Sequence, residues 1–325
     1  MGEFDLIARH FTRPPRGPWP SQGVGDDCAL IDLPGLRLAV SCDMLIAGRH
    51  FFPDDEPEAI GHKALAVNLS DLAAAGAAPR ACFLAIGLPE ADESWLTRFA
   101  AGLHALADAH GCPLLGGDTT RTPALADGAG PLTLSLTVLG ELPSGLGLTR
   151  GGARPGDEIW VSGELGDAAL ALSVRRGTVG LAADVMAAVR ARLERPQPRV
   201  ALGQALLGLA SSAIDVSDGL AADLGHVLER SGVGARLRWP AVPRSVAPRA
   251  QPETLQREYA LAGGDDYELL FTAPPTRRRE IEAAAHASGV AASRIGEIRA
   301  APGLEILDAG GVRIELGRRG YDHFG

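Results

Sequence analysis

The sequence has few aromatic residues, and it lacks both a long apolar run and an excess of basic residues. Only 5% of its 325 residues are aromatic while 46% are hydrophobic, so we expect an interior of alanine, leucine and valine, in a chain long enough for two domains. The net charge of −9 argues against nucleic-acid binding, which needs a basic surface. No apolar run approaches the roughly 18 residues needed to cross a bilayer.

Cysteine is also scarce. The four cysteines, Cys28, Cys42, Cys82 and Cys112, are far apart and form no Cys-x-x-Cys pair. This spacing indicates neither a zinc site nor a dense disulfide framework, and it favours a reducing, cytoplasmic location. Residues 1–11 mix charged and apolar residues at helical spacing, so they do not read as a signal peptide.

Two common sequence templates for phosphate transfer are missing. The chain has no Gly-x-x-x-x-Gly-Lys-Ser/Thr loop, and its nearest fragment, Gly61-His62-Lys63, lacks the upstream glycine and the following hydroxyl. The His-Arg-Asp and Asp-Phe-Gly motifs of protein kinases do not occur either. If the protein handles a polyphosphate, metal ions and a few isolated cations must neutralise its charge.

What the chain does have is a series of acidic residues beside glycine or serine at turn-like positions. These acids are Asp26, Asp27, Asp43, Asp71, Asp118, Asp215, Asp218, Asp265 and Asp266. Hard cations such as Mg²⁺ take oxygen ligands and are held by one or two carboxylates together with substrate phosphates. The pattern therefore predicts a metal-bridged phosphate site.

Hydrophobic periodicity predicts an α/β chain in which strands and helices alternate. Strands are expected at 36–41, 81–88, 113–115, 132–139, 158–162, 213–216, 268–272 and 294–298, and helices at 58–75, 93–110, 167–176, 200–210, 220–231 and 276–287. The stretch 143–156 is rich in glycine and contains prolines, so it is the expected domain boundary. The motifs of Asp71 and Asp118 recur at Asp218 and Asp265 with the same spacing, which either duplication or chance explains.

Several of these motifs also have a purely structural interpretation. Gly25-Asp26-Asp27 can be a simple turn, and Ser217 can cap the helix expected from Leu220. Residues 116–120 are either a loop after a short strand or a nest of backbone amides for a phosphate. Arg150 can be solvated, although the glycines around it allow a phosphate to approach closely. The number of such motifs in one chain favours the functional interpretation.

Asn68 and Asp71 stand three residues apart on the expected helix and so share a face beside apolar residues. A carboxylate at such a place is seldom left unpaired, so we expect a metal or an arginine as the partner of Asp71. Asp215 and Asp218 flank a serine where a strand ends, which is where ligands usually bind in α/β folds. His50 on its own is more often a packed surface histidine than a ligand-binding residue.

Taken in order, the motifs resemble those of the thiamine-monophosphate kinase family, whose superfamily also contains aminoimidazole ribonucleotide synthetase, selenophosphate synthetase and the hydrogenase-maturation carbamoyl dehydratase. The segments that carry the resemblance are 2–7, 25–29, 47–51, 63–74, 116–120, 215–220 and 320–324. They extend over nearly the whole chain. The Lys-Ala-Leu-Ala-Val-Asn-Leu-Ser-Asp and Gly-Tyr-Asp-His-Phe elements are specific to this family within the superfamily.

The resemblance implies ATP-dependent phosphorylation of thiamine monophosphate to thiamine diphosphate by a homodimer. It implies the two-domain fold of aminoimidazole ribonucleotide synthetase, with mixed sheets covered by helices and the site in a cleft between domains 1–148 and 149–325. Several Mg²⁺ ions and ATP as co-substrate are implied, and a K⁺ requirement is left open. Nucleic acids and membranes are not expected as partners.

The implied site residues fall into three groups. The implied Mg²⁺ ligands are Asp27, Ser41, Cys42, Asp43, Asp71, Asp118, Asp215 and Asp218, of which Asp27, Asp43, Asp71 and Asp118 are also taken as catalytic. The implied ATP contacts are Gly117, Asp118, Arg150 and Ser217. The implied acceptor contacts are His50, Asp265 and Arg318.

Three positions depart from the family pattern. Cys42 stands where threonine is common, and because a thiol is a poor Mg²⁺ ligand we expect any contact there through the backbone carbonyl. Asp265 replaces a glutamate, which shortens its reach by one methylene group. Arg318 replaces a tryptophan, which removes an aromatic surface for the thiamine rings. The departures touch the acceptor side and leave the metal-binding acids intact.

Two other functions fit part of the pattern. Another ATP-dependent enzyme of the superfamily could act on a different small molecule, although no cysteine precedes Asp26 to serve as the reactive residue of a selenophosphate synthetase. A protein that binds Mg-ATP without turnover is the second alternative, and acids in both halves argue against it. ADP release that depends on thiamine monophosphate would discriminate between these functions.

Overall fold

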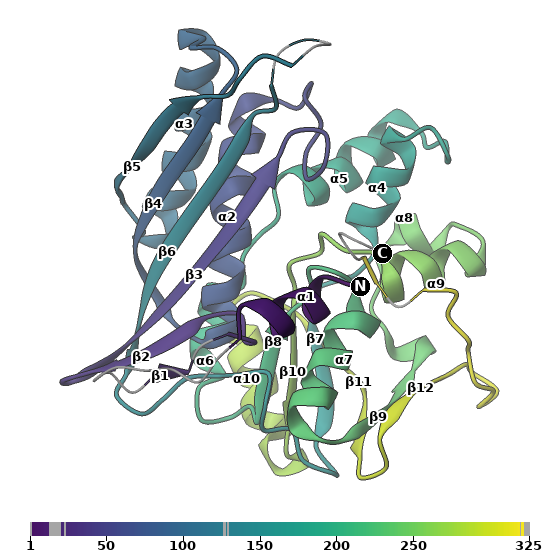
Figure 1. The fold of residues 1–325 in the computed structure, drawn as a ribbon. Helices are drawn as coiled ribbons and strands as arrows, with labels where there is room; N and C mark the ends of the chain where they lie inside the picture. Colours follow the sequence, from purple (N-terminus) through teal and green to yellow (C-terminus); the bar gives the residue numbers. More distant parts are fainter. Residues whose placement is uncertain are drawn as a thin grey trace.

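The computed structural model describes residues 2–12, 21–22, 24–125, 128, 130–318 and 320–321. Within them the chain forms two six-stranded sheets with helices between and around them (Figure 1). Of the expected terminal motif, Gly320 and Tyr321 are described, whereas Asp322, His323 and Phe324 lie outside the described residues.

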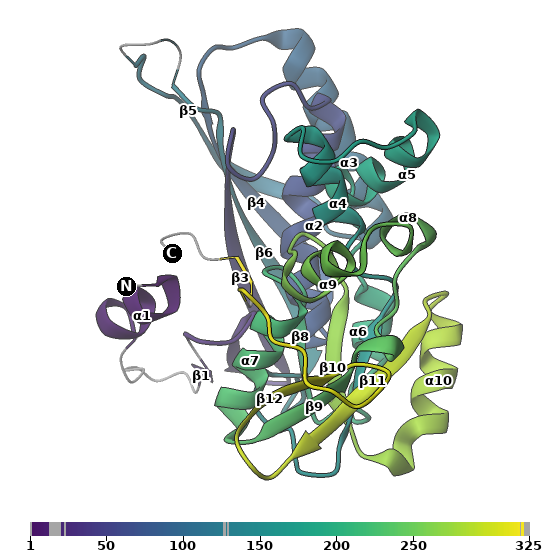
Figure 2. The same ribbon diagram turned by 90° about the vertical axis from the view of Figure 1, so that its right-hand side faces the viewer.

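The first sheet comes from the N-terminal half. In spatial order its strands are β1 (Ser21–Gln22), β2 (Ala29–Leu33), β3 (Leu36–Ile46), β6 (Thr133–Pro143), β4 (Ala78–Leu88) and β5 (Leu114–Arg121). Neighbouring strands are antiparallel except β4 and β5, which are parallel. Helices α2 (Pro57–Ala75) and α3 (Glu93–His110) lie on one side of this sheet and α1 (Glu3–His10) on the other (Figure 2).

The second sheet comes from the C-terminal half. In spatial order its strands are β12 (Gly303–Leu307), β9 (Gly234–Arg238), β11 (Ala292–Arg299), β7 (Glu158–Ser162), β10 (Leu269–Ala273) and β8 (Ser212–Asp215). The helices of this half are α4 (Asp167–Arg175), α5 (Ala183–Glu194), α6 (Val200–Ala205), α7 (Leu220–Ser231), α8 (Val246–Arg249), α9 (Glu253–Ala262) and α10 (Arg278–Ala287), with 3-10 turns η1 (Trp239–Ala241) and η2 (Pro275–Arg277). In this second sheet β9 and β12 are a parallel pair. Like the first sheet, it is therefore mixed.

Helix α2 packs between the two sheets. It contacts β3 and β6 of the first sheet and β8 and β10 of the second, and its leucines share one core with Phe271 of β10. A helix that is apolar on all sides is a buried helix, and small residues let its neighbours come close: a Cβ on Gly61 would lie 2.1 Å from the carbonyl oxygen of Phe99 in α3. Two polar residues of α2 lie at the junction of the two halves, where Lys63 pairs with Asp265 and Ser70 donates to Asp215.

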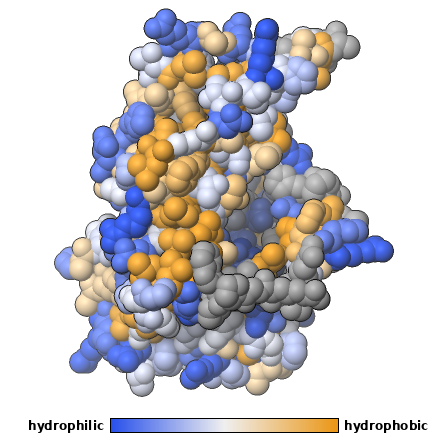
Figure 3. All heavy atoms as spheres, turned by 60° about the vertical axis from the view of Figure 1, so that its left-hand side comes forward, coloured by the Kyte–Doolittle hydropathy of each residue, from blue (hydrophilic) through white to orange (hydrophobic). Residues whose placement is uncertain are grey.

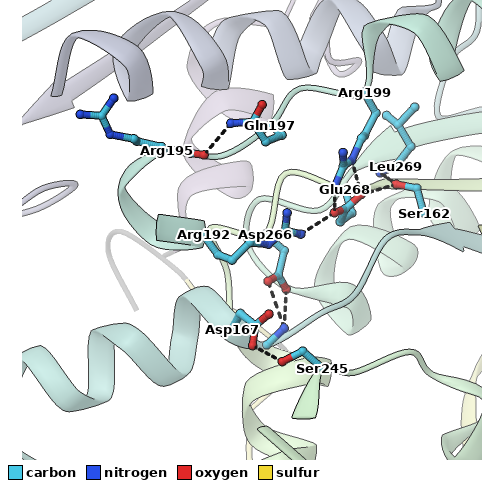
Figure 4. A network of polar contacts seen from close by, with 11 residues as sticks. Ser162, Asp167, Arg192, Arg195, Gln197, Arg199, Ser245, Asp266, Glu268 and Leu269 are labelled. Carbon is cyan, nitrogen blue, oxygen red and sulfur yellow. Dashed lines mark hydrogen bonds and ion pairs between the residues drawn. The ribbon is translucent and has the colours of Figure 1, made fainter. Parts of the chain in front are cut away.

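A buried polar network fixes the segment that leads into β10 (Figure 4). The Glu268 carboxylate, which is 0% exposed, accepts hydrogen bonds from Arg192 at 2.7 Å and from Arg199 at 2.6 Å. Two residues earlier, Asp266 accepts the backbone N–H of Gly166 at 3.0 Å. Removing one partner of a buried ion pair leaves an uncompensated charge and costs about 3–5 kcal/mol, so this segment is held firmly to the second half.

Most of the elements expected from the sequence are confirmed, with shifted ends. The first predicted strand continues from residue 41 to Ile46, and the helix predicted at 200–210 ends at Ala205. The prediction of a loop at 116–120 is wrong, because these residues belong to the edge strand β5. The phosphate-binding role of this segment stays a prediction. Helices α5 and α9 were not expected at all.

The segment between the sheets contains no helix or strand among its residues 144–157, all of which are described. The limits 1–148 and 149–325 stay a proposal for the two domains. All four cysteines are free thiols. In the described part of the chain, no helix combines the length and apolar character that a membrane span requires.

Candidate functional site

A cleft of about 650 Å³ lies where the two halves meet. It receives predicted site residues from both halves: Asp27, Ser41, Cys42, Asp43, His50, Asp71, Arg150, Asp215, Ser217, Asp218, Asp265 and Arg318. Seen from the side of the first sheet, a band of apolar residues lies beside a hollow with hydrophilic residues (Figure 3). The chain therefore brings most of the expected site together, from segments far apart in sequence.

Three carboxylates form the centre of this cleft. One oxygen each of Asp27, Asp71 and Asp215 lies within 4.8 Å of the others. Asp71 projects from α2, Asp215 ends β8, and Asp27 precedes β2, so the group exists only because α2 joins the two sheets. Hydroxyl groups fix two of the acids: Ser41 donates to Asp71, and Ser70 donates to Asp215 at 2.6 Å.

The electrostatics of the group favour a bound cation. Burial raises the pKa of Asp71 well above its ordinary value, and repulsion from neighbouring acids, Asp43 and Asp215 first, raises it further. Burial and the nearby Asp27 raise the pKa of Asp215 to about 8, and burial with the same neighbour raises that of Asp43 to about 6. Acids that repel one another in this way are stabilised by a nearby cation. Because the donors are all oxygens, the group suits Mg²⁺.

Arg150 lies at the edge of this group. Its side-chain Nη2 lies 2.6 Å from Asp27 Oδ1, and its backbone N–H donates to Asp26 at 2.6 Å. Burial raises the pKa of Asp27, and the Arg150 guanidinium opposes that rise. Arg150 is thus a paired cation beside the acids rather than a solvated surface residue.

The prediction that Asn68 and Asp71 share a helix face is confirmed, since both meet β3. Asn68 accepts the backbone N–H of Asp43 at 3.0 Å and donates to the carbonyl of Ala64 at 3.0 Å. The protein partner of the Asp71 carboxylate is the hydroxyl of Ser41, and among the described residues no arginine forms a salt bridge with it, which corrects the arginine alternative.

Ser217 is not the cap of α7. The cap residue is Gly219, and the backbone N–H groups of Gly219 and Asp218 donate to the Asp223 carboxylate at 3.0 and 3.2 Å. The capping interpretation of Ser217 is therefore wrong, and the residue lines the cleft instead.

Two of the expected acceptor residues, His50 and Asp265, line both the cleft and a smaller side pocket. The Nδ1 atom of His50 accepts the backbone N–H of Ile46 at 2.9 Å, so in the neutral ring the proton is on Nε2. The Asp265 carboxylate pairs with Lys63 at 2.8 Å. A side pocket of about 90 Å³ continues from here, and Phe51, Phe52 and Ile60 contribute to its apolar wall.

Two of the departing residues have partners outside the group of three acids. Arg318 is 56% exposed and lies 3.3 Å from a carboxylate oxygen of Glu258. Cys42 is exposed, with its sulfur 3.4 Å from the hydroxyl of Ser135. Because successive residues of a strand face opposite sides, the Cys42 thiol lies on the face away from Asp43.

Gly117 and Asp118 do not line the cleft of the single chain. Through the strand register, Asp118 stands in one row with Ala85, Ser135 and Met44, and Met44 is the neighbour of Asp43 on the opposite face. Three strand spacings of ~4.8 Å also separate β5 from β3.

Gly117 has a structural reason to be glycine. Its φ is +156°, and a Cβ there would lie 1.8 Å from the carbonyl oxygen of Leu84 on the neighbouring strand. The residue is therefore explained by the close pairing of β4 and β5. A phosphate is not needed to account for it.

Sequence reasoning missed three residues of the site. Ser70, inside the Asn-Leu-Ser-Asp motif, joins the halves through Asp215. Lys63 joins them through Asp265, and Tyr267 donates to the same carboxylate at 3.3 Å. A signal for Lys63 was present, because it is the single lysine among the 31 basic residues of the chain.

The two halves of the chain match the two domains of the AIR synthase related proteins. The model of their N-terminal domain matches residues 25–142, and the model of their C-terminal domain matches residues 154–309. Among curated proteins, the thiamine-monophosphate kinase of Salmonella typhimurium is 45% identical over 329 residues, which cover 99% of this chain and 98% of that protein.

Solved structures agree with these matches. The crystal structure of thiamine-monophosphate kinase from Stenotrophomonas maltophilia superimposes with a TM-score of 0.78 at 44% identity, over 94% of this chain and 96% of that one. The structure of AaThiL complexed with AMPPCP and TMP superimposes with a TM-score of 0.83 at 29% identity, over 99% and 97%. This chain belongs to the thiamine-monophosphate kinase family.

Proposed function

We infer that this chain is an enzyme that transfers a phosphoryl group from ATP to thiamine monophosphate and forms thiamine diphosphate. The observation that carries this conclusion is the 45% identity to a thiamine-monophosphate kinase over 99% of the chain. The cleft adds chemical support, because it places buried acids of both halves around one space. A structure of a relative bound to AMPPCP and TMP fits the same pair of substrates.

The transfer proceeds in line and directly between the two substrates. The second pKa of a phosphate monoester is ~6, so the acceptor is largely anionic at neutral pH and needs no strong protein base. The residues of the cleft therefore act by holding ATP and acceptor in position. A bound Mg²⁺ would supply charge neutralisation between the two polyanions.

The carboxylates assigned to the metals are those at the centre of the cleft. Asp27, Asp71 and Asp215 offer converging oxygens, and Asp43 and Asp218 line the same space. Ser41 contributes through its contact with Asp71, and Cys42 through its backbone carbonyl. Arg150 and Ser217 are assigned as the ATP contacts within the cleft of this chain. Gly117 and Asp118 lie outside that cleft.

A second copy of the chain accounts for the position of Gly117 and Asp118 outside the cleft. Asp118 stands on a sheet face that also carries Met44, 56% exposed, and Phe83, 36% exposed. An apolar sheet face of this kind suits a symmetric contact between two copies. We propose a homodimer in which the Asp118 carboxylate and the Gly117 backbone of one chain complete the site of the other.

The proposed reaction is tested by one coupled assay of ADP release. Purified protein with Mg-ATP is offered thiamine monophosphate, thiamine or an unrelated phosphate monoester. We expect ADP release with thiamine monophosphate alone, together with thiamine diphosphate as the product. Equal release with every acceptor, or none with thiamine monophosphate, would contradict the assignment.

The change His50→Ala is expected to impair use of the acceptor and to leave ATP binding unchanged. His50 lines the cleft and the side pocket, with its Nδ1 bound to the backbone of Ile46. Its loss removes a hydrogen bond donor at Nε2, which is worth roughly 0.5–1.5 kcal/mol, so the KM for thiamine monophosphate should rise severalfold. A rise confined to the KM for ATP would move His50 to the nucleotide side.

The change Arg318→Trp is expected to tighten acceptor binding modestly. The guanidinium of Arg318 turns to Glu258 and is largely exposed, so it gives little contact to a ring in the cleft. An indole there would add about 1 kcal/mol of aromatic contact, or about a fivefold lower Kd, with turnover little altered. Calorimetry with thiamine monophosphate and a non-hydrolysable ATP analogue measures this Kd; a tenfold loosening would mean that Arg318 makes a needed contact.

A further inference from the structure

The single lysine of the chain is buried in the middle of α2. Lys63 is 3% exposed, and the other 30 of the 31 basic residues are arginines. A buried ammonium group is tolerated when it is paired. The chain uses arginine at all of the remaining 30 positions, so it has a specific use for lysine here.

The partners of Lys63 are two residues already assigned to the acceptor. Its Nζ lies 2.8 Å from Asp265 Oδ1 and donates to the backbone carbonyl of His50 at 3.1 Å. His50 follows β3 in the first half, whereas Asp265 precedes β10 in the second. One ammonium group thus joins the two sides of the cleft, and it lines both the cleft and the side pocket.

The loop that carries Asp265 has an unusual backbone. Asp265 has a φ of +67° and Tyr267 a φ of +50°, the non-glycine residues with positive φ in the described part of the chain. Such strain persists where the surroundings fix it, and it concentrates at ligand-binding sites. On the side of the second half, Asp266 and Glu268 fix this loop (Figure 4). On the side of the first half, Lys63 is its ion pair.

The contacts leave one oxygen of Asp265 for a ligand. Lys63 and Tyr267 both bind Oδ1, and no hydrogen bond from the described residues reaches Oδ2. Because Asp265 lines the cleft, that oxygen can accept an N–H of the acceptor or oppose a positive ring. Its usefulness depends on the carboxylate being held in place, and the contact with the Lys63 ammonium group holds it.

We propose that Lys63 is a positioning residue for the acceptor: it holds the Asp265 carboxylate and the His50 loop in the arrangement that receives the ring system of the phosphorylated acceptor. This inference rests on the proposed function. A lysine suits the place because its compact ammonium group fits between a carbonyl and a carboxylate, whereas the planar guanidinium of arginine is larger and has fixed donor directions.

The first test compares Lys63→Met, Lys63→Arg and Asp265→Asn with the wild type. The methionine variant keeps an unbranched side chain and loses the charge. We expect its KM for thiamine monophosphate to rise at least about tenfold, as for loss of a charged hydrogen bond, with the KM for ATP within about twofold. The arginine variant should lie between it and the wild type, and the double variant Lys63→Met with Asp265→Asn should lose little more than either single change.

Arg98→Met is the matched control. Arg98 of α3 pairs with Glu58 at the start of α2, so its loss removes an ion pair to the same helix outside the cleft, and both KM values should stay unchanged. An acceptor KM within about twofold of the wild type in folded Lys63→Met would overturn the inference. So would equal rises in both KM values, which mark a structural role.

The second test uses the wild type and does not depend on the variants folding. With a single lysine, protein labelled with ¹⁵N at lysine Nζ reports on one side chain. We expect its resonance to move on titration with thiamine monophosphate and to saturate with the calorimetric Kd; an unmoved resonance at saturation contradicts the inference. If the wild type shows no turnover, the proposed function is wrong and this inference falls with it. If the wild type turns over but the resonance does not move, this inference alone is wrong.

Discussion

Asp71→Asn is expected to lower turnover at least about a hundredfold while the protein stays folded, because it removes a charge that offsets charge in the transition state. Asp71 lies at the centre of the site. Its carboxylate is close to those of Asp27 and Asp215, and the Ser41 hydroxyl donates a hydrogen bond to it. Asparagine keeps the size of the side chain and can still accept from Ser41. The measurement is kcat at saturating Mg²⁺, ATP and thiamine monophosphate, with the melting temperature recorded alongside.

Asp32→Asn is the control for this change. Asp32 lies in β2 of the first sheet and pairs with Arg37 at 2.6 Å near the surface, so its loss should leave kcat unchanged. If Asp71→Asn keeps wild-type turnover at saturating Mg²⁺, the assignment of Asp71 to a metal is wrong. If the melting temperature of Asp71→Asn falls far below that of Asp32→Asn, the loss of turnover comes from damaged packing.

The sequence predicted the parts of the site that short motifs encode. Asp27 precedes β2, Asp71 follows Ser70 inside α2, and Asp215 ends β8; their residue types alone indicate oxygen ligation. Their convergence could not be read from the motifs. It depends on α2 packing between two sheets, a tertiary arrangement that the apolar pattern of one helix does not specify.

The errors have physical causes. Residues 116–120 contain two glycines and two threonines, and glycine is typical of turns, yet the strand pairing of β5 with β4 prevailed there. Lys63 was overlooked because its partner Asp265 is distant in sequence and is presented by a loop of positive φ. Local propensity carries no information about either contact.

The position of Asp118 leads to a sharper expectation for the assembly. Asp118 stands in a row with Met44 on the face away from Asp43, and it does not line the cleft of its own chain. If a second copy supplies it, Asp118→Asn and Asp71→Asn damage the same site from different chains. Each variant alone should then lose about a hundredfold or more in turnover, since each removes one charge facing the phosphates.

Mixing the two variants should restore activity. When dimers exchange chains at random, about half are mixed, and in a symmetric pair one of the two mixed sites has both acids intact, so turnover should recover to about a quarter of the wild type. The recovery should follow subunit exchange and should be absent when chains are mixed just before the assay. If Asp118 acted within its own chain, every site would lack one acid and no recovery would occur at any exchange time. Sedimentation of each variant as a dimer shows that the contact itself survives the substitution.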